Sequence, residues 1–222
     1  MRVTLLQHGN ESLSGVAALA CTSDKPIESL QERGAILDKV LERVYGMGHE
    51  SVLEHMTFTF AISGVSRALS HQLVRHRIAS YSQRSQRYVA ERQFHFVVPP
   101  SIAQHPTAEA LFTHMMGDIQ QVYDYLVEAG IPAEDARYVL PNATTTQLIV
   151  TMNARSLLHF FSERLCSTAQ WEIRQLAQAM LAEAKKISPI IMQFAGPKCM
   201  KQGFCKESYA RWEACQLQPR KD

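Results

Sequence analysis

Hydrophobic residues recur with two different spacings along this chain of 222 residues, and the order of those spacings restricts its fold. From Met56 to Ile62 every second residue is apolar, which predicts a half-buried strand that Gly64 ends. Between residues 108 and 128 apolar residues return every three or four positions, which predicts a helix with its apolar stripe in the core. The stripe consists of Ala108, Leu111, Phe112, Met115, Ile119, Val122 and Leu126.

Shorter segments complete the pattern. We expect strands at residues 3–8, 94–100 and 144–151, and helices at 28–45, 66–76, 132–138, 153–165 and 167–187. Asn153 is placed to cap one of these helices, and Ser167 or Thr168 the next. Because strands and helices do not alternate regularly, the pattern predicts an α+β fold with a mixed or antiparallel sheet and flanking helices. We expect one domain over residues 1–195 and a cysteine-containing tail over 196–222.

Composition excludes several classes of protein. Hydrophobic residues make up 46% of the chain and charged residues 20%, values typical of a folded globular domain. A formal net charge of +2 does not imply a general polyanion binder, although a local basic patch can hide within a balanced total. The chain shows neither a secretory signal pattern nor an apolar run of roughly 18 residues, so we expect a cytoplasmic protein without membrane spans. Its five cysteines include no CxxC pair, so we expect reduced thiols.

An arginine-rich segment between residues 67 and 92 is the first sign of function. It contains six arginines, no lysine and a single acid, Glu91. Arginine binds phosphates and carbonyl edges in two-point contacts, and the interleaved serines and glutamines add neutral hydrogen-bonding groups, a combination suited to a nucleotide. Two other interpretations stay open: a solvent-exposed face with salt bridges, and a nucleic-acid-binding module in which Tyr81 and Tyr88 stack on bases. The arginines are Arg67, Arg75, Arg77, Arg84, Arg87 and Arg92.

Four blocks of sequence give this segment a more specific meaning. They are GHES at 48–51, RHRIASYSQRSQRY at 75–88, EDARYVLPNATTT at 134–146, and NARSLLHFFSERL with AQWEIR at 153–174. In this order they resemble the flavin-dependent thymidylate synthases over roughly residues 30–190. The resemblance implies reductive methylation of deoxyuridine monophosphate (dUMP) to thymidine monophosphate (dTMP), with 5,10-methylenetetrahydrofolate as carbon donor and NADPH-reduced FAD as hydride carrier. It also implies a homotetramer whose subunits share each active site, with small molecules rather than nucleic acid as ligands.

The same resemblance implies a set of ligand-binding residues. For FAD they are Ser51, Arg75, His76, Arg77, Asn153, Arg155 and His159. For dUMP they are Gln72, Arg75, Gln83, Arg84, Ser85, Gln86, Arg87, Arg137 and Arg164. One helix thus carries residues for both ligands, since Arg155 and His159 share a face and Arg164 lies about 180° from Arg155 by helical rotation.

Arg164 is the residue to which the resemblance gives the catalytic role. A guanidinium beside the pyrimidine carbonyl would stabilise the negative charge that develops when nitrogen 3 of uracil ionises, which activates carbon 5. The alternative is an arginine at a helix end that pairs with Glu163 or Glu172. We assign Ser85 to substrate binding rather than nucleophilic attack, because no base stands at a suitable spacing from it.

The cysteines receive no catalytic role. Cys166 lies within a matched block, but nothing around it suggests a nucleophile, so we expect a structural thiol. Cys199, Cys205 and Cys215 do not have the usual paired spacing of zinc ligands, and we expect no metal.

The chain departs from the resemblance at three positions. Ser82 and Gln83 stand where many relatives carry Asn and Glu, which removes an acid near the substrate and leaves the contact of Gln83 open. His159 stands where Asn is common, and a neutral imidazole can still donate one hydrogen bond to a flavin. A flavoprotein of this fold without methylation activity is a further alternative.

Overall fold

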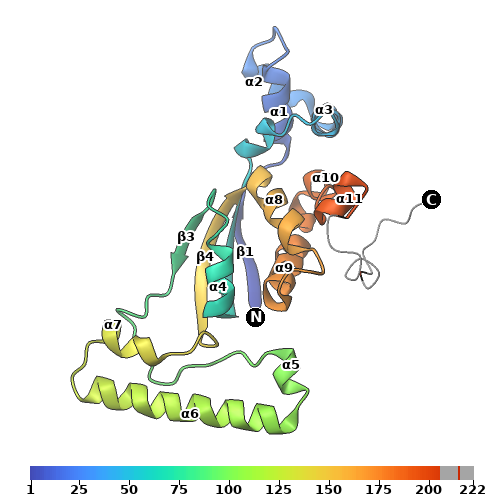
Figure 1. The fold of residues 1–222 in the computed structure, drawn as a ribbon. Coiled ribbons are helices and arrows are strands. Elements are labelled where there is room, and N and C mark those ends of the chain that lie inside the picture. Colours follow the sequence, from blue (N-terminus) through green and yellow to red (C-terminus); the bar gives the residue numbers. More distant parts are fainter. Residues whose placement is uncertain (206–214, 216–222) are drawn as a thin grey trace. The chain divides into compact units, whose positions relative to one another are not determined.

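The computed structural model describes residues 1–205 and residue 215 (Figure 1). Its strands are β1 (Arg2–His8), β2 (Thr57–Ser66), β3 (Ser80–Gln83) and β4 (Thr145–Asn153). Its α-helices are α1 (Ser12–Ala20), α2 (Ile27–Leu30), α3 (Ala35–Gly46), α4 (Arg67–Leu73), α5 (Pro100–Ala103), α6 (Pro106–Glu128), α7 (Ala133–Ala136), α8 (Ala154–Arg164), α9 (Trp171–Ile187), α10 (Pro189–Met192) and α11 (Lys198–Gln202). Short 3-10 helices are η1 (Gln31–Arg33), η2 (Ser51–His55) and η3 (Arg137–Val139).

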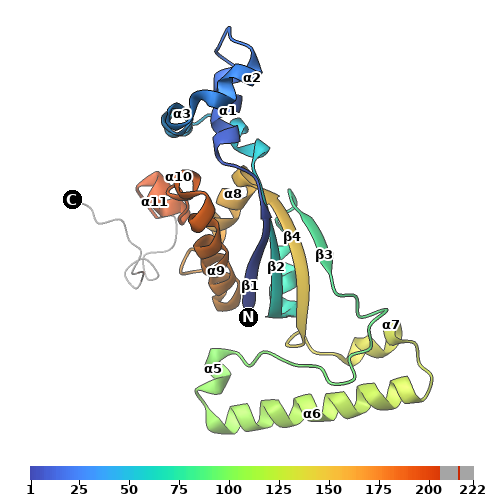
Figure 2. The same ribbon diagram turned by 180° about the vertical axis from the view of Figure 1, so that it is seen from behind.

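The strands form a four-stranded antiparallel sheet in the order β1-β2-β4-β3 (Figure 2). Along β2, buried and accessible residues alternate as the period predicts, and Phe58, Phe60 and Ile62 are buried. The central pair, β2 and β4, joins strands that are far apart in the sequence. The prediction of an α+β fold with an antiparallel sheet and flanking helices is confirmed.

Packing divides the chain into two compact units, each built from several separate segments. The first unit contains residues 1–2, 62–75 and 81–149. The second contains residues 3–61, 76–80 and the chain from Val150 onward. The prediction of one domain over residues 1–195 with a tail stays a prediction, and most of that tail lies outside the described residues.

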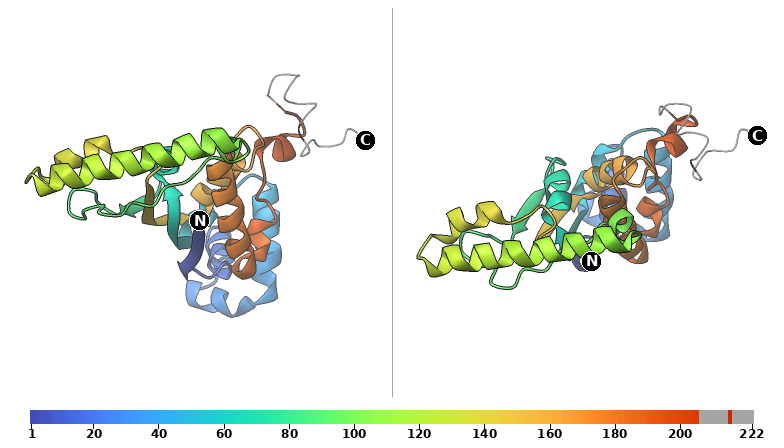
Figure 3. Two further views of the ribbon diagram at one scale, coloured as in Figure 1. Left: turned by 90° about the horizontal axis from the view of Figure 1, so that it is seen from below. Right: turned by 60° about the horizontal axis from the view of Figure 1, so that its bottom comes forward.

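In the first unit, α6 packs against α5, α7 and η3 (Figure 3). Tyr123 of α6 is buried, and its hydroxyl accepts the backbone N–H of Glu91 at 3.1 Å. Gln120 accepts the backbone N–H of Phe94 at 2.8 Å and donates to the carbonyl of Glu91 at 3.1 Å. Helix α6 therefore fixes the loop that leads out of the arginine-rich segment.

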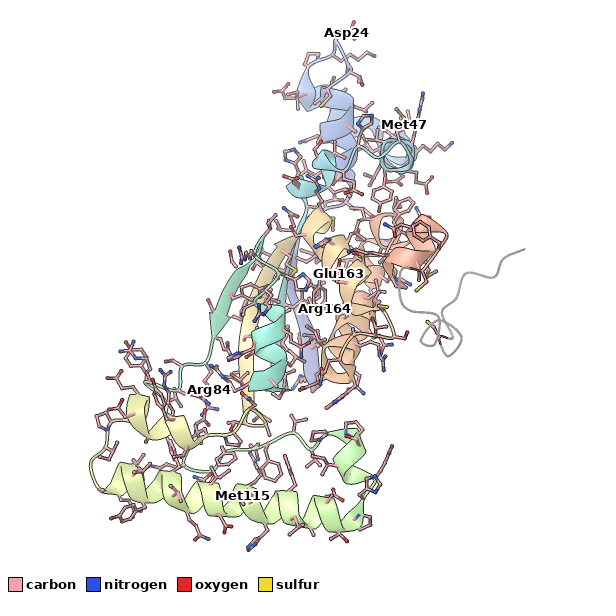
Figure 4. All side chains as sticks on the ribbon, in the orientation of Figure 1. Asp24, Met47, Arg84, Met115, Glu163 and Arg164 are labelled. Carbon is pink, nitrogen blue, oxygen red and sulfur yellow. The ribbon has the colours of Figure 1, made fainter. Side chains whose placement is uncertain are left out.

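The prediction that the apolar stripe of α6 lies in the core is wrong for much of the stripe. Leu111, Met115 and Val122 are 66%, 53% and 48% exposed, and Met115 is labelled on the helix in Figure 4. Met116 and Tyr123 are the buried residues of α6. Periodicity identifies an apolar face, but it does not distinguish a face packed within the chain from one that the chain leaves uncovered.

In the second unit, α1 packs closely against α3. A Cβ atom at Gly15 would lie 2.7 Å from the carbonyl oxygen of Leu37, so the contact requires glycine. Val16, Leu30 and Leu37 form a small core there. The sequence pattern missed α1 because small residues supply most of its buried face, and small residues give a weak hydrophobic period.

Two predicted elements have different ends from those expected. The single helix over 28–45 is wrong, because Gly34, with φ of 48°, separates η1 from α3. The strand that begins near Thr57 does not stop at Gly64 but continues to Ser66. The Ser66 hydroxyl then accepts a backbone N–H of α4, so strand and helix follow each other directly.

The strand predicted over residues 94–100 is also wrong. An isolated bridge between Phe96 and Thr144 stands in its place, and two prolines follow. Prolines lack the N–H that a continuing ladder requires. Strand β3 was missed because Ser80–Gln83 is too polar to show an apolar alternation.

The remaining predicted elements are confirmed to within a few residues. Asn153 caps α8, as predicted, by accepting the N–H of Ser156 at 2.8 Å. Helix α9 is capped by Gln170, and the prediction of Ser167 or Thr168 as its cap is wrong. None of the helices within residues 1–205 combines the length and hydrophobicity that crossing a bilayer requires.

Candidate active site

Most of the residues predicted to bind dUMP lie in the first unit, in or near the turn that follows β3. The backbone N–H of Arg84 donates to the carbonyl of Gln147 on β4 at 3.0 Å, so the turn starts from the sheet. The Ser85 hydroxyl accepts the N–H of Arg87 at 3.2 Å, and the Ser85 carbonyl accepts that of Val89 at 3.1 Å. These bonds close a tight turn that presents its side chains together.

Glu134 and Glu91 contact the arginines in and near this turn. Arg87 Nε lies 2.8 Å from Glu134 Oε2, and Arg137 Nε donates to the backbone carbonyl of Glu134 at 3.0 Å. Arg84, labelled in Figure 4, lies 3.4 Å from Glu91 Oε2 through its Nη2. The Arg87 and Glu134 side chains are both about half exposed, so this ion pair contributes little stability and can exchange for a ligand phosphate. Three of the predicted substrate residues are thus brought together.

Glu91 is the buried acid beside these arginines. It is 6% exposed, and burial raises its pKa, while Arg84, Arg67 and His95 lower it. Burial also lowers the pKa of Arg67, as does the charge of Arg137. Arg84 and Arg67 are two guanidinium groups near one carboxylate, and they leave an excess of positive charge that suits a phosphate. Arg67 is not among the predicted ligand residues, and its place in the arginine-rich segment is the only sequence signal for it.

Gln83, at the end of β3, donates from Nε2 to Ser70 Oγ at 3.1 Å and to Thr146 Oγ1 at 3.2 Å. Three other predicted substrate residues, Gln72, Arg75 and Gln86, also belong to the first unit. Within residues 1–205, their side chains form no hydrogen bond or ion pair. Gln86 is part of the turn by its position between Ser85 and Arg87, whereas the structure places Gln72 and Arg75 in the same unit without a side-chain contact to the turn.

The two tyrosines of the arginine-rich segment differ in their surroundings. The Tyr81 hydroxyl donates to the carbonyl of Leu73 at 2.9 Å, and burial raises its pKa to about 12. Tyr88 is 82% exposed, with the Arg87 guanidinium 5.6 Å from its ring centroid. Tyr81 is thus anchored through its hydroxyl, and Tyr88 is the more exposed of the two rings.

Most of the residues predicted to bind FAD lie in the second unit, where η2 and the start of α8 come together. Arg155 Nη1 lies 2.6 Å from Glu54 Oε1, and its Nε lies 3.7 Å from Glu50 Oε2. These two acids stand on either side of Ser51 in the sequence, so the ion pairs hold Ser51 and Arg155 in one region. Sequence reasoning missed both acids, although Glu50 belongs to the GHES block.

His76 connects the arginine-rich segment to α8. Arg164 Nε donates to His76 Nε2 at 3.0 Å. The His76 ring lies 6.1 Å from the ring of His159 and packs edge-on against Phe160 at 5.0 Å. Burial, together with the charges of Arg164 and His159, lowers the His76 pKa to about 4, while Glu163 opposes them. His76 is therefore neutral at physiological pH and accepts at Nε2, which places its proton on Nδ1.

The alternative reading of Arg164 as half of a helix-end ion pair is wrong. Glu163 instead forms an ion pair with Lys198 of α11, and this contact helps to lower the Glu163 pKa against the effect of burial. Within the described part of the chain, Arg164 forms no salt bridge. Figure 4 labels both Glu163 and Arg164 at the end of α8. Arg77, the last residue of the triplet, is exposed.

The cysteines lie in the second unit. Cys166 Sγ contacts Thr168 Oγ1 at 3.2 Å, and the Ser167 hydroxyl donates to Cys215 Sγ at 3.1 Å. Burial and the nearby thiols of Cys205, Cys166 and Cys215 raise the pKa of Cys199. Among residues 1–205 and 215, no three His, Cys, Asp or Glu side chains are placed to hold a metal ion.

The class of protein follows from comparison with known families. The model of the family described as thymidylate synthase complementing protein matches residues 4–190 of this chain. That match spans both clusters of site residues and all four sequence blocks. The chain belongs to this family, the flavin-dependent thymidylate synthases.

Individual relatives agree with this assignment. The chain is 49% identical to the flavin-dependent thymidylate synthase of Geobacter sulfurreducens, over 93% of this chain and 91% of that protein. It is 41% identical to the enzyme of the same name from Pyrococcus furiosus, over 100% and 96% of the two chains. The crystal structure of the Helicobacter pylori flavin-dependent thymidylate synthase complexed with FAD and dUMP superposes with a TM-score of 0.71 at 25% identity, covering 88% of this chain and all of that one.

Proposed function

We propose that this protein converts dUMP to dTMP by reductive methylation, with 5,10-methylenetetrahydrofolate as carbon donor and NADPH as the reductant of FAD. The observation that carries the proposal is the pairing of Arg164 with the neutral imidazole of His76 at 3.0 Å, in a chain of this family. A guanidinium fixed by a neutral acceptor keeps its full charge for a substrate.

The second unit offers groups that fit a flavin dinucleotide. The pyrophosphate of FAD is an anion, and Arg155 and Ser51 supply a guanidinium and a hydroxyl in one region. Asn153 uses its oxygen to cap α8, which leaves its amide N–H groups for a ligand. When bound, FAD supplies the hydride chemistry, and the protein supplies orientation and electrostatics. The other residues assigned to FAD are Arg75, His76, Arg77 and His159.

The first unit offers groups that fit the phosphate of dUMP. The turn after β3 carries Arg84, Ser85 and Arg87, and Glu134 brings Arg137 to the same place. A phosphate that displaces the exposed Glu134 carboxylate from Arg87 would gain a two-point contact. Exposed turn residues with displaceable partners suit a ligand that must enter and leave in each turnover.

Arg164 is proposed to activate the pyrimidine ring. Its Nε–H is held by His76, so its remaining N–H groups can face a carbonyl oxygen of uracil. Positive charge there stabilises the anion formed when nitrogen 3 loses its proton, and the added electron density makes carbon 5 nucleophilic. His76 contributes by holding the guanidinium without neutralising it.

No thiol is proposed to attack the pyrimidine. Cys166 is already in contact with Thr168, and Cys199 is buried with a raised pKa. A raised pKa lowers the fraction of thiolate, which is the reactive form. Electrostatic activation by Arg164 takes the place of a covalent intermediate.

We further propose that the protein works in the cytoplasm as a homotetramer with shared active sites. Support comes from α6, where Leu111, Met115, Val122 and Tyr125 are all exposed and share one side of the helix by their spacing. A contiguous exposed apolar face marks an interface, and a second copy of the chain is the proposed partner. Light scattering tests this: a monomer-sized mass for the wild-type protein would reject the proposal.

The experiment that tests the proposed function has two stages. The purified protein should show the absorbance of oxidised flavin, or acquire it when FAD is added. It should then release tritium from [5-³H]dUMP only when both methylenetetrahydrofolate and NADPH are present. Absence of flavin uptake rejects the flavin-dependent mechanism, and flavin uptake without tritium release supports the alternative of a flavoprotein that lacks methylation activity.

A further inference from the structure

An ion pair joins the end of α8 to α11. Lys198 Nζ contacts Glu163 Oε1, and Glu163 directly precedes Arg164 (Figure 4). Lys198 is the first residue of α11, whereas the family model matches the chain only as far as residue 190. A segment beyond the matched residues therefore supplies a cation close to the residue that is proposed to activate the substrate.

Packing in the second unit fixes the backbone that carries Lys198. The ring of Phe194, between α10 and α11, stacks on the ring of Tyr45 of α3, with centroids 4.0 Å apart. Cys199, the next residue after Lys198, is 9% exposed. The Lys198 side chain itself is about half exposed. Its ammonium group thus extends from an anchored helix to the Glu163 carboxylate.

Glu163 occupies an unfavourable position for an acid. It lies in the last turn of α8, where the free backbone carbonyls of a helix already carry partial negative charge. Burial raises the Glu163 pKa, but the contact with Lys198 and the charges of His159 and Arg164 outweigh burial and lower it. The carboxylate is therefore ionised at neutral pH, and Lys198 is the cation that contacts it.

The charge of Glu163 acts on the residues of the proposed site. It interacts electrostatically with Arg164 and His159, and it raises the pKa of His76. The proposed mechanism requires positive charge at Arg164, where the pyrimidine becomes anionic. A carboxylate without a partner would reduce the positive potential there and would repel the developing anion. A carboxylate paired with an ammonium group has a field that falls off faster with distance than the field of a single charge.

We infer that Lys198 is a positioning residue for the reaction: it compensates the charge of Glu163 and so preserves the positive potential of Arg164 for activation of the pyrimidine. The inference rests on the proposed function. Lys198 acts through Glu163 and contacts no ligand. Removal of Lys198 alone should therefore slow the reaction, and removal of both charges should not.

Steady-state kinetics of a double-mutant cycle test the inference. The rate of tritium release from [5-³H]dUMP at saturating FAD and dUMP gives kcat for each protein. Lys198→Met keeps most of the aliphatic stem without the charge, and its kcat is expected to fall about three- to fivefold, the range of a solvent-screened ion pair. Glu163→Gln and the double variant are expected to stay within about twofold of wild type, as is Lys198→Arg.

Salt dependence gives a second readout that a purely structural role would not change. The Debye length falls from about 10 Å at roughly 0.1 M ionic strength to about 3 Å at roughly 1 M. The kcat ratio of wild type to Lys198→Met should therefore approach one as the salt concentration rises. A ratio that does not change with salt overturns the inference.

The other outcomes separate the inference from the function on which it rests. Wild-type turnover in Lys198→Met overturns the inference, and so does a loss that Glu163→Gln does not restore in the double variant. A wild-type protein that releases no tritium overturns the proposed function as well. Thermal unfolding checks that each variant is folded, and Lys198→Gln serves as a second variant without the charge.

Discussion

Two regions of the molecule hold their arginines in different ways. In the turn after β3, Arg84 and Arg87 face the carboxylates of Glu91 and Glu134. At the end of α8, Arg164 instead faces a neutral imidazole, and no carboxylate lies within salt-bridge distance of it in the described residues. One region thus keeps its cations paired with acids, and the other keeps a cation unpaired.

We infer that the two regions have different roles: the turn after β3 binds the substrate, and Arg164 activates it. A paired arginine stays oriented without ligand, and it exchanges one anion for another when a phosphate arrives. Arg164 forms no ion pair in the described residues, although the Glu163 carboxylate interacts with it electrostatically. Its charge can therefore act on the charge that develops during the reaction. Substrate affinity should therefore depend on the first region, and the rate of the chemical step on Arg164 and the group that positions it.

The largest effect is expected from Arg164→Ala. Loss of a preorganised donor at a developing anion typically lowers kcat by about 100–1000-fold, and FAD binding should be unchanged. Arg164→Lys keeps the charge but lacks the Nε–H that His76 accepts, so it should retain more activity than the alanine variant while remaining well below wild type. Tritium release at saturating dUMP measures both. Undiminished turnover of Arg164→Ala would reject the activating role.

An effect of intermediate size is expected from Glu91→Gln, and it concerns stability. Burial raises the pKa of Glu91 despite Arg84, so the ionised carboxylate is less favourable in the fold than in the unfolded chain. This lowers the free energy of unfolding above the raised pKa, and the penalty disappears as the pH falls through that pKa. Glu91→Gln, which is neutral at every pH, should melt roughly 2–4 °C higher than wild type at pH 8.

Calorimetry from pH 8 to pH 4 checks this prediction through its pH dependence. The difference in Tm between Glu91→Gln and wild type should shrink as the wild-type carboxylate becomes protonated. If Glu91→Gln is less stable than wild type at pH 8, the prediction is wrong. The ion pair with Arg84 would then stabilise the fold by more than burial of the Glu91 carboxylate destabilises it.

The smallest effect is expected from Glu54→Gln in the second unit. The Glu54 and Arg155 side chains are both about half exposed, and pairs of this kind contribute little. The dissociation constant of FAD should change by only about two- to threefold, since Glu50 still faces Arg155. Fluorescence titration with FAD measures it, and a change of tenfold or more would show that Glu54 does more than orient Arg155.

The sequence predicted the fold class and most elements because their hydrophobic periods are strong. It failed where stability comes from something other than apolar spacing. Helix α1 packs through small residues such as Gly15, and β3 is polar throughout. The exposed stripe of α6, with Leu111 as an example, has the period of a core helix, and only the structure reveals that the described residues leave it exposed.

The site was predicted at the level of residues but not of contacts. Sequence blocks identified Arg164 and Arg155, yet spacing along the chain does not reveal partners from distant segments. His76 is 88 positions from Arg164, and Glu54 is 101 positions from Arg155. Spacing along the sequence also suggests that Arg164 pairs with a nearby acid such as Glu163. In the structure its hydrogen-bond partner is instead the neutral imidazole of His76, which the fold brings close to it.

The central claim, that His76 positions Arg164 for activation, is tested most directly by a double-mutant cycle on kcat at saturating FAD and dUMP. His76→Phe keeps a ring without an acceptor and should lower kcat about tenfold, whereas His76→Gln keeps an acceptor and should restore most of that loss. In the Arg164→Lys background, which has already lost the Nε–H, His76→Phe should have little further effect. Losses that simply multiply in the double variant would contradict the account, because they would show that the two residues act independently.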